Sequence, residues 1–250
     1  MNITLKNGDT FRKIINCLKD LITDSGEFLF DHKGISMQST DTSKVVMIDI
    51  LLGQESFDVY KLDSGTKEIK LPFNFINFND ILKLSKSDHI GMIYKKDSDK
   101  VTLKLNENNK KVQFNMVLSS VDKEQLEVGE IDYAVSVYID ANELQKSIKD
   151  LSSFGKKCTI SVDSDNITLS VTGDAGDGEI SIPNAEIIYS DPAVKNKEFM
   201  GVFNTKYLNF FAKAGLSAEI IMKFGVDVPF CFEYQLEHGH VKFYLAQMSE

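Results

Sequence analysis

Four segments of the chain carry apolar residues at the three- and four-residue spacing of an amphipathic helix. They fall at about 11–22, 74–85, 144–151 and 204–215. Between them, short stretches alternate apolar and polar residues and are bounded by turn sequences such as DHKG, KDSD and DSDN, which predict strands joined by hairpins. The order of helix, strands, helix, strands occurs twice. This pattern predicts an α+β fold.

The chain also resembles itself at an offset of about 130 residues. LKDL at 18–21 lies opposite IKDL at 148–151, and Asn74 and Lys83 fall opposite Asn204 and Lys213. Pairs in order at nearly one offset indicate two copies of one unit. Residues 118–133 have few periodic features and an acidic bias, as in a surface linker. We therefore expect an N-terminal domain at 1–117, a connecting linker at 118–133 and a C-terminal domain at 134–250.

The composition suits a protein with a substantial core, because 42% of the 250 residues are hydrophobic. No apolar run reaches the roughly 18 residues that a membrane span needs, and MNITLKNGDTFRK is not typical of a signal peptide. We expect a soluble, intracellular protein. Cys17, Cys158 and Cys231 are too few and too widely spaced for a disulfide framework or a zinc site. They are predicted to be small buried side chains.

Positive charge is concentrated on the predicted helices, although the formal net charge is -9. A solvated helix face usually carries some lysine, but here all four helices do. Their recurrence favours one positive surface that contacts a phosphate backbone. Only Tyr207 adds an aromatic ring at the margin, which favours duplex over single-stranded nucleic acid. The predicted DNA-binding residues are Arg12, Lys13, Lys19, Lys83, Lys146, Lys149, Lys206 and Lys213.

Catalytic motifs are weak. GDAGDG lacks the Lys-Ser/Thr ending of a phosphate loop and is more typical of a hairpin. The sequence DSD at 97–99 and 163–165 could bind a divalent ion, although aspartate is common in turns. We find no set of nucleophile, base and orienting residue, and expect neither catalysis, nor a metal site, nor a cofactor. A metal-dependent phosphoesterase using Asp163 and Asp165 is the alternative from another class.

Several longer stretches are similar to one family over nearly the whole chain. They include GISMQSTDTSKV from residue 34, VDKEQLEVGEIDYA from 121, KYLNFFAKA from 206 and HVKFYLA from 240. In these stretches the chain resembles the proliferating cell nuclear antigen family, the eukaryotic-type DNA sliding clamps. The resemblance implies two topologically similar domains, with three chains closed head to tail. Helices would line the hole of this ring and sheets would form its outside.

The function implied by this resemblance is that of a noncatalytic homotrimeric clamp. It would encircle duplex DNA without reading its sequence and tether a replicative polymerase, giving processivity in replication and repair. A clamp loader, nuclease and ligase would dock through short peptide motifs, and no membrane is involved. The family implies the nucleus, with a viral or cytoplasmic replication site left open. A subunit of a heteromeric checkpoint-type clamp is the alternative within the fold.

The resemblance also implies two further sets of residues. The partner pocket beneath the linker would be formed by Thr40, Lys44, Val45, Met47, Leu126, Val128, Pro229, Tyr244 and Ala246. The subunit contact would use the strands KVQFNMVLS and GDGEISI, which taken alone are typical of half-buried strands. Its residues would be Val112, Phe114, Met116, Leu151, Phe154, Ile180 and Ile182.

Several positions depart from the family pattern, among them Thr40 and Lys44 at the pocket rim and Phe114, where the family usually has tyrosine. Asp80 stands at a usually basic or neutral position of the hole, and Gly129 replaces a linker proline, which loosens the linker. Ser164 occupies the place of the lysine to which the family attaches ubiquitin, so that modification is not implied at this position.

Overall fold

The computed structural model describes residues 1–23, 25–107, 110–120, 129, 131–163, 166–191 and 198–248. The chain divides into two compact units. Unit 1 comprises Met1–Lys44, Ile48–Glu127 and Leu236–His240, and unit 2 comprises Val45–Met47, Val128–Gln235 and Val241–Glu250. The predicted linker at 118–133 stays a prediction, because most of it lies outside the described residues.

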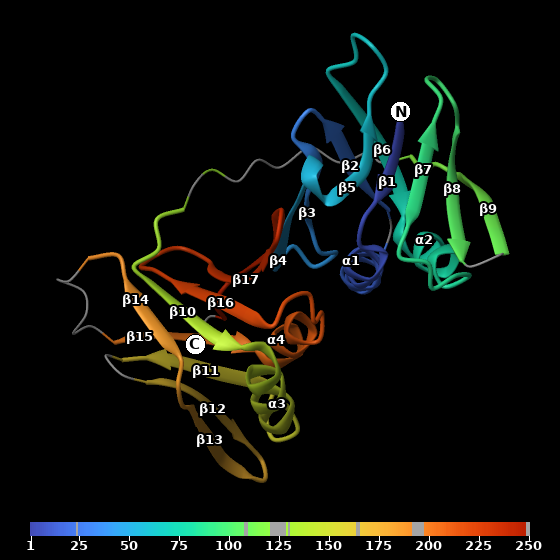
Figure 1. The fold of residues 1–250 in the computed structure, drawn as a ribbon. Helices are drawn as coiled ribbons and strands as arrows, with labels where there is room; N and C mark the ends of the chain where they lie inside the picture. Colours follow the sequence, from blue (N-terminus) through green and yellow to red (C-terminus); the bar gives the residue numbers. More distant parts are fainter. Residues whose placement is uncertain are drawn as a thin grey trace. The chain divides into compact units, whose positions relative to one another are not determined.

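Unit 1 contains two helices and most of the first nine strands (Figure 1). The elements are β1 (Asn2–Leu5), α1 (Gly8–Leu21), β2 (Ser25–Asp31), β3 (Gly34–Thr40), β4 (Val46–Gly53), the short 3-10 helix η1 (Gln54–Ser56), β5 (Phe57–Lys61), β6 (Glu68–Asn74), α2 (Phe75–Leu82), β7 (Ile90–Tyr94), β8 (Lys100–Glu107) and β9 (Lys110–Val117).

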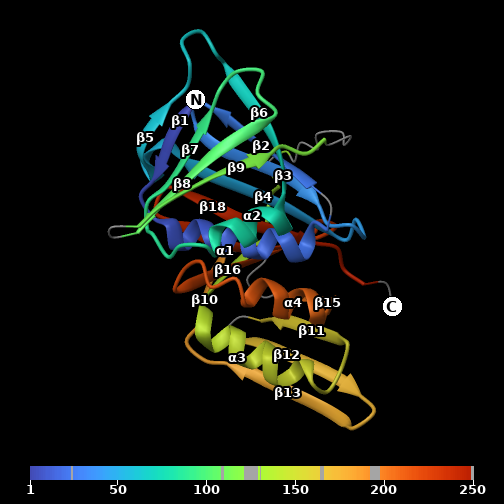
Figure 2. The same ribbon diagram turned by 90° about the vertical axis from the view of Figure 1, so that its right-hand side faces the viewer.

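The strands of unit 1 form two groups. One sheet has the order β5-β1-β7-β8-β9, with antiparallel neighbours throughout. The other group runs β4-β3-β2-β6. Helices α1 and α2 pack side by side, as Figure 2 shows. Their apolar stripes meet a core rich in phenylalanine, in which these side chains are almost fully buried: Phe11, Phe28, Phe30, Phe73, Phe75 and Phe78.

Unit 2 repeats the plan with its own helices and strands. Its elements are β10 (Val135–Asp140), α3 (Ala141–Ser152), β11 (Lys157–Val162), β12 (Ile167–Gly173), β13 (Gly176–Ile182), β14 (Glu186–Tyr189), β15 (Phe199–Asn204), α4 (Thr205–Ala212), β16 (Glu219–Phe224), β17 (Phe230–Leu236) and β18 (Gly239–Leu245).

The strands of unit 2 also form two groups. Strands β13-β12-β11-β15 form an antiparallel sheet of four, and β14-β10-β16-β17-β18 follow one another in the second group. Helix α3 packs against α4 and contacts β10, β12 and β13 (Figure 2). The sequence GDAGDG forms the hairpin between β12 and β13, as expected.

The two units share details of their second helices, as the internal repeat predicts. Asn74 and Asn204 are the N-caps of α2 and α4, and each side-chain oxygen accepts a backbone N–H of the first turn. Lys83 and Lys213 end these helices and donate their N–H to the carbonyls of Asn79 and Asn209. Helix α4 is shorter than the expected 204–215, since its last turn ends at Ala212.

The cysteines are buried and unpaired, which confirms their expected role as small core side chains. Burial raises the pKa of the Cys158 and Cys231 thiols to about 12, and also raises the pKa of Cys17. Among the described residues, no cluster of three His, Cys, Asp or Glu side chains is arranged to hold a metal ion. No helix in that part of the chain is long and apolar enough to cross a membrane.

Candidate nucleic-acid interface and partner surfaces

The lysines on the exposed faces of α1 and α2 lie beside carboxylates. Lys13 Nζ is 3.0 Å from Asp9 Oδ2, one helical turn away, and Lys19 Nζ is 3.6 Å from Asp20 Oδ1. On α2, Lys83 Nζ is 3.1 Å from Asp80 Oδ1. The Lys13 and Lys83 pairs are solvent-exposed and contribute little stability, whereas Lys19 is half-buried. In each pair the carboxylate offsets the charge that a phosphate would meet.

Arg12, also predicted to bind DNA, is directed toward α2. Its Nε donates to the Leu82 carbonyl at 3.3 Å, and an Nη donates to the Ser87 carbonyl. Both acceptors lie at or beyond the end of α2, where carbonyls lack helical partners and a cation is favourable. The half-buried guanidinium therefore joins α1 to the segment after α2, while its charge still contributes to the local field.

The lysines of unit 2 are differently placed. Lys146, Lys149, Lys206 and Lys213 are all exposed, and none has a carboxylate within ion-pair distance among the described residues. Helix α4 has Lys206 where α2 has the exposed Ile76. The span from α2 to its cap carries one aspartate and one lysine, which cancel, whereas the corresponding span of α4 carries two lysines and no acid.

Of the predicted partner-pocket residues that the structure describes, five belong to unit 2. Val45 is 36% exposed, and its carbonyl accepts the Ala246 N–H at 3.3 Å, so these two residues are adjacent. Pro229 is exposed, Met47 is half-buried and Tyr244 is 9% exposed. Thr40 and Lys44 belong to unit 1, and Leu126 and Val128 lie outside the described residues.

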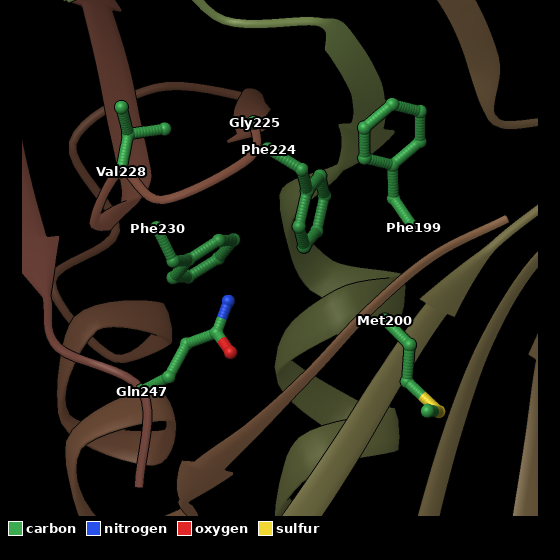
Figure 3. Close-up of a pocket in the computed structure, with 7 residues that line it drawn as sticks. All are labelled: Phe199, Met200, Phe224, Gly225, Val228, Phe230 and Gln247. Carbon is green, nitrogen blue, oxygen red and sulfur yellow. The ribbon is translucent and has the colours of Figure 1, made fainter. Parts of the chain in front are cut away.

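A small pocket of about 20 Å³ is lined in part by Val228 and Gln247, which are the chain neighbours of Pro229 and Ala246. This pocket was not predicted from the sequence. Figure 3 shows its apolar lining of Phe224, Val228 and Phe230, with the Gln247 amide pointing toward the Phe230 ring. Its volume is close to that of one water-sized site. The lining residues come from segments far apart in the chain, and no sequence pattern indicates that these segments meet.

The strands predicted to contact a second subunit are both sheet edges. β9 ends the five-stranded sheet of unit 1, and β13 ends the four-stranded sheet of unit 2. Phe114 on β9 is 43% exposed, and Val117, which sequence reasoning did not include, is 60% exposed. Val112 and Ile180 are half-buried, and Phe154, in the turn after α3, is 53% exposed. Met116, Leu151 and Ile182 are buried inside their own units.

Two comparisons identify relatives of this chain. The family model "Proliferating cell nuclear antigen, N-terminal domain" matches residues 1–126, and "Proliferating cell nuclear antigen, C-terminal domain" matches residues 127–248. The crystal structure of proliferating cellular nuclear antigen from Entamoeba histolytica is similar, with a TM-score of 0.90 and 25% identity over 99% of this chain and 98% of that one. The expected clamp fold of two similar domains is thereby confirmed. The chain belongs to the proliferating cell nuclear antigen family of DNA sliding clamps.

Proposed function

We propose that three copies of this chain close head to tail into a ring that encircles duplex DNA. The ring would tether a replicative polymerase and other replication and repair factors in the nucleus, without catalysing a reaction itself. Threading on the duplex, rather than tight binding, would provide processivity. The observation that carries this proposal is the pair of unlike sheet edges at β9 and β13.

The two edge strands are similar in length and opposite in charge. β9 has eight residues and begins with the exposed Lys110 and Lys111, while β13 has seven and carries the exposed Asp177 and Glu179. A sheet edge presents unpaired N–H and C=O groups that favour pairing with another strand. Because a basic edge repels its own kind and attracts an acidic one, the pairing is heterologous, and heterologous contacts can close a ring.

The apolar side chains fit the same contact. Phe114 and Val117 expose apolar surface on β9, and Phe154 exposes an aromatic ring near β13. We propose these three, with Val112 and Ile180, as direct contacts. Met116, Leu151 and Ile182 form the buried layer behind them.

DNA contact is proposed for the exposed helix faces, where phosphates would be neutralised without base readout. Partner peptides are proposed to dock near Val45, Pro229 and Ala246, because an apolar anchor needs an accessible apolar surface with a polar rim. Val45 is accessible, and the Gln247 amide supplies a polar group beside Ala246.

The mass of the protein in solution, measured by light scattering after size exclusion over a range of concentrations, tests the ring. We expect a mass near three times 28.1 kDa. The Phe114→Asp variant should shift the mass toward that of a monomer, while Val226→Asp, which alters another exposed apolar residue, should not. A parent protein that stays monomeric at all concentrations would contradict the homotrimer and favour a heteromeric clamp.

A further inference from the structure

The five-stranded sheet of unit 1 has one polar face that neither the proposed DNA contact nor the proposed peptide pocket uses. Figure 2 shows its strands β5, β1, β7, β8 and β9 side by side. On β1 and β8 every second side chain is buried, for example Ile3 and Leu103. The side chains between them point away from the core, and strand pairing places Thr4 beside Gly91 and Gly91 beside Lys104.

This polar face is basic. The register of the five strands gives its residues, which are Val59, Lys61, Asn2, Thr4, Gly91, Ile93, Lys100, Thr102, Lys104, Asn106, Lys111, Gln113, Asn115 and Val117. All four lysines are exposed, and none has a carboxylate within ion-pair distance among the described residues. The four-stranded sheet of unit 2 instead carries the exposed Asp177 and Glu179 on β13. In a chain of net charge -9, the polar face of unit 1 is locally favourable for an anionic ligand.

The strands of this sheet contain two carboxylates, and both have partners. Asp58, at the register shift between β5 and β1, lies 3.2 Å from His89 Nδ1. Glu107 is turned toward the segment after α2, where the Ser85 hydroxyl and the Lys86 N–H each donate to it at 3.1 Å. Glu107 thus lies on the other side of β8 from Lys104, and Asp58 is the one acid at the margin of the polar face within these strands.

The loops at the Lys61 and Lys100 end of the face do not reverse its charge. Asp63 Oδ1 accepts a hydrogen bond from the Met1 amine at 3.0 Å, so its charge is paired. The sequence KKDSD between β7 and β8 has two lysines and two aspartates, which cancel. The excess of positive charge therefore comes from the face itself.

The proposed ring leaves most of this face open. Lys111 lies on β9, the edge strand proposed to contact a second copy, so we leave it out of the site. Pairing at an edge extends a sheet within its own plane and does not cover the faces of the strands behind it. The site is therefore Lys61, Lys100 and Lys104 with the neutral side chains between them. From strand geometry, Lys104 lies about 13 Å from Lys100 along β8 and about 14 Å from β5.

We propose that this polar face binds an acidic segment of a partner protein. Carboxylates of the segment pair with Lys61, Lys100 and Lys104, at distances that about four extended residues bridge. Its backbone N–H groups donate to the side-chain oxygens of Asn2 and Asn106. A phosphodiester backbone offers no donors to these oxygens, which favours a peptide over a nucleic acid. The site is separate from the proposed peptide pocket and does not depend on ring closure.

The test uses a fluorescein-labelled peptide of glutamate, aspartate and glycine, titrated with the whole protein and followed by anisotropy. A peptide with glutamine and asparagine in place of the acids is the ligand control and should not bind. The Lys61→Glu/Lys104→Glu variant should bind the acidic peptide about tenfold more weakly, as expected for two exposed charges. Lys61→Arg/Lys104→Arg keeps both charges and should stay within about twofold of the parent.

Two matched variants separate this face from attraction by other lysines. Lys33→Glu/Lys70→Glu changes the net charge equally, at exposed positions of the other strand group of unit 1. Lys149→Glu/Lys213→Glu does so on the helices of unit 2. Both should stay within about twofold of the parent at about 0.1 M salt, where exposed charges more than about 10 Å apart are largely screened. Light scattering gives the mass of each variant, and loss of peptide binding at the parent's mass supports the face independently of ring closure.

Three results would overturn the proposal. The first is no binding of the acidic peptide by the parent. The second is a loss in either matched variant as large as that in Lys61→Glu/Lys104→Glu, which would show general attraction or binding at the helices. The third is displacement of the peptide by a short duplex oligonucleotide whose own binding is lost in Lys61→Glu/Lys104→Glu. That result would assign the polar face to nucleic acid.

Discussion

Lys83 Nζ lies 3.1 Å from Asp80 Oδ1 at the end of α2, whereas the repeat-related Lys213 of α4 has the half-buried Phe210 at the corresponding earlier position. A carboxylate three residues from a lysine on a helix lowers the local positive potential. The two units therefore present unequal charge on otherwise similar helices. In a clamp with both helix faces toward DNA, unit 2 would make the stronger phosphate contacts.

Removal of the Asp80 carboxylate should strengthen the association with DNA. We expect Asp80→Asn to steepen the dependence of log affinity on log salt by up to about one unit, because Lys83 gains a phosphate contact. The measurement is fluorescence anisotropy of a labelled duplex at several salt concentrations. Asp99→Asn, in an exposed turn, is the charge-matched control. Equal effects of both variants would show that only net charge matters.

A second prediction compares lysines at equivalent places in the two repeats. Lys149→Ala/Lys213→Ala should reduce the salt slope by about two units, since both lysines lack acidic partners in the described residues. Lys19→Ala/Lys83→Ala should reduce it by clearly less, because Asp20 and Asp80 offset these charges. The same titration measures both. If the unit 1 pair had the larger effect, the assignment of the stronger contact to unit 2 would be wrong.

Arg12 should matter more for stability than for DNA. Arg12→Ala removes two hydrogen bonds from the guanidinium to carbonyls at the end of α2, and should lower the free energy of unfolding by about 2 kcal/mol. Urea denaturation followed by circular dichroism measures this change. Lys13→Ala, next to it on α1 and exposed, should cost less than about 0.5 kcal/mol. If the Arg12→Ala variant were as stable as the parent but bound DNA more weakly, Arg12 would instead be a DNA-binding residue.

The helices were predictable because their signals are local. Apolar spacing gave the buried stripes, and Asn74 and Asn204 stand where an N-cap is favoured. The Lys83–Asp80 pair also follows from a spacing of three residues. By contrast, the direction of Arg12 depends on a carbonyl 70 residues away, which no local pattern encodes.

The positions of the sheet edges depend on pairing between strands. Alternation indicated that β9 and β13 are strands, but their positions at the ends of different sheets follow from pairing with β8 and β12. On β9 the expected alternation holds for the half-buried Val112 and the buried Met116, but Phe114 on the same face is 43% exposed, because an edge strand has a neighbour on one side only. The Gly155 and Gly173 contact was invisible in sequence, since a glycine does not reveal which backbone approaches it.

Stability should fall in alkaline solution because of the buried thiols. The pKa of Cys158 and Cys231 is raised from 9.0 to about 12 by burial, so the unfolded chain loses these protons first. The stability contributed by the neutral thiols is complete below pH 9 and is lost as the pH rises toward 12, by up to about 1.4 kcal/mol per pH unit for each group. Urea titrations between pH 8 and 10 measure the slope. Cys158→Ala should make it shallower, and an unchanged slope would contradict this origin.

The charges on β9 and β13 allow a rescue experiment on subunit contact. Lys110→Glu/Lys111→Glu should dissociate the proposed ring, because the altered β9 would face Asp177 and Glu179 on the next copy. Like charges brought together in an interface cost several kcal/mol. Asp177→Lys/Glu179→Lys should dissociate it equally, whereas the combined variant with all four changes should regain the parent's mass. Light scattering at one concentration compares the four proteins. If each double variant keeps the parent's mass, these edges do not pair; if the combined variant stays dissociated, the charges do not face one another.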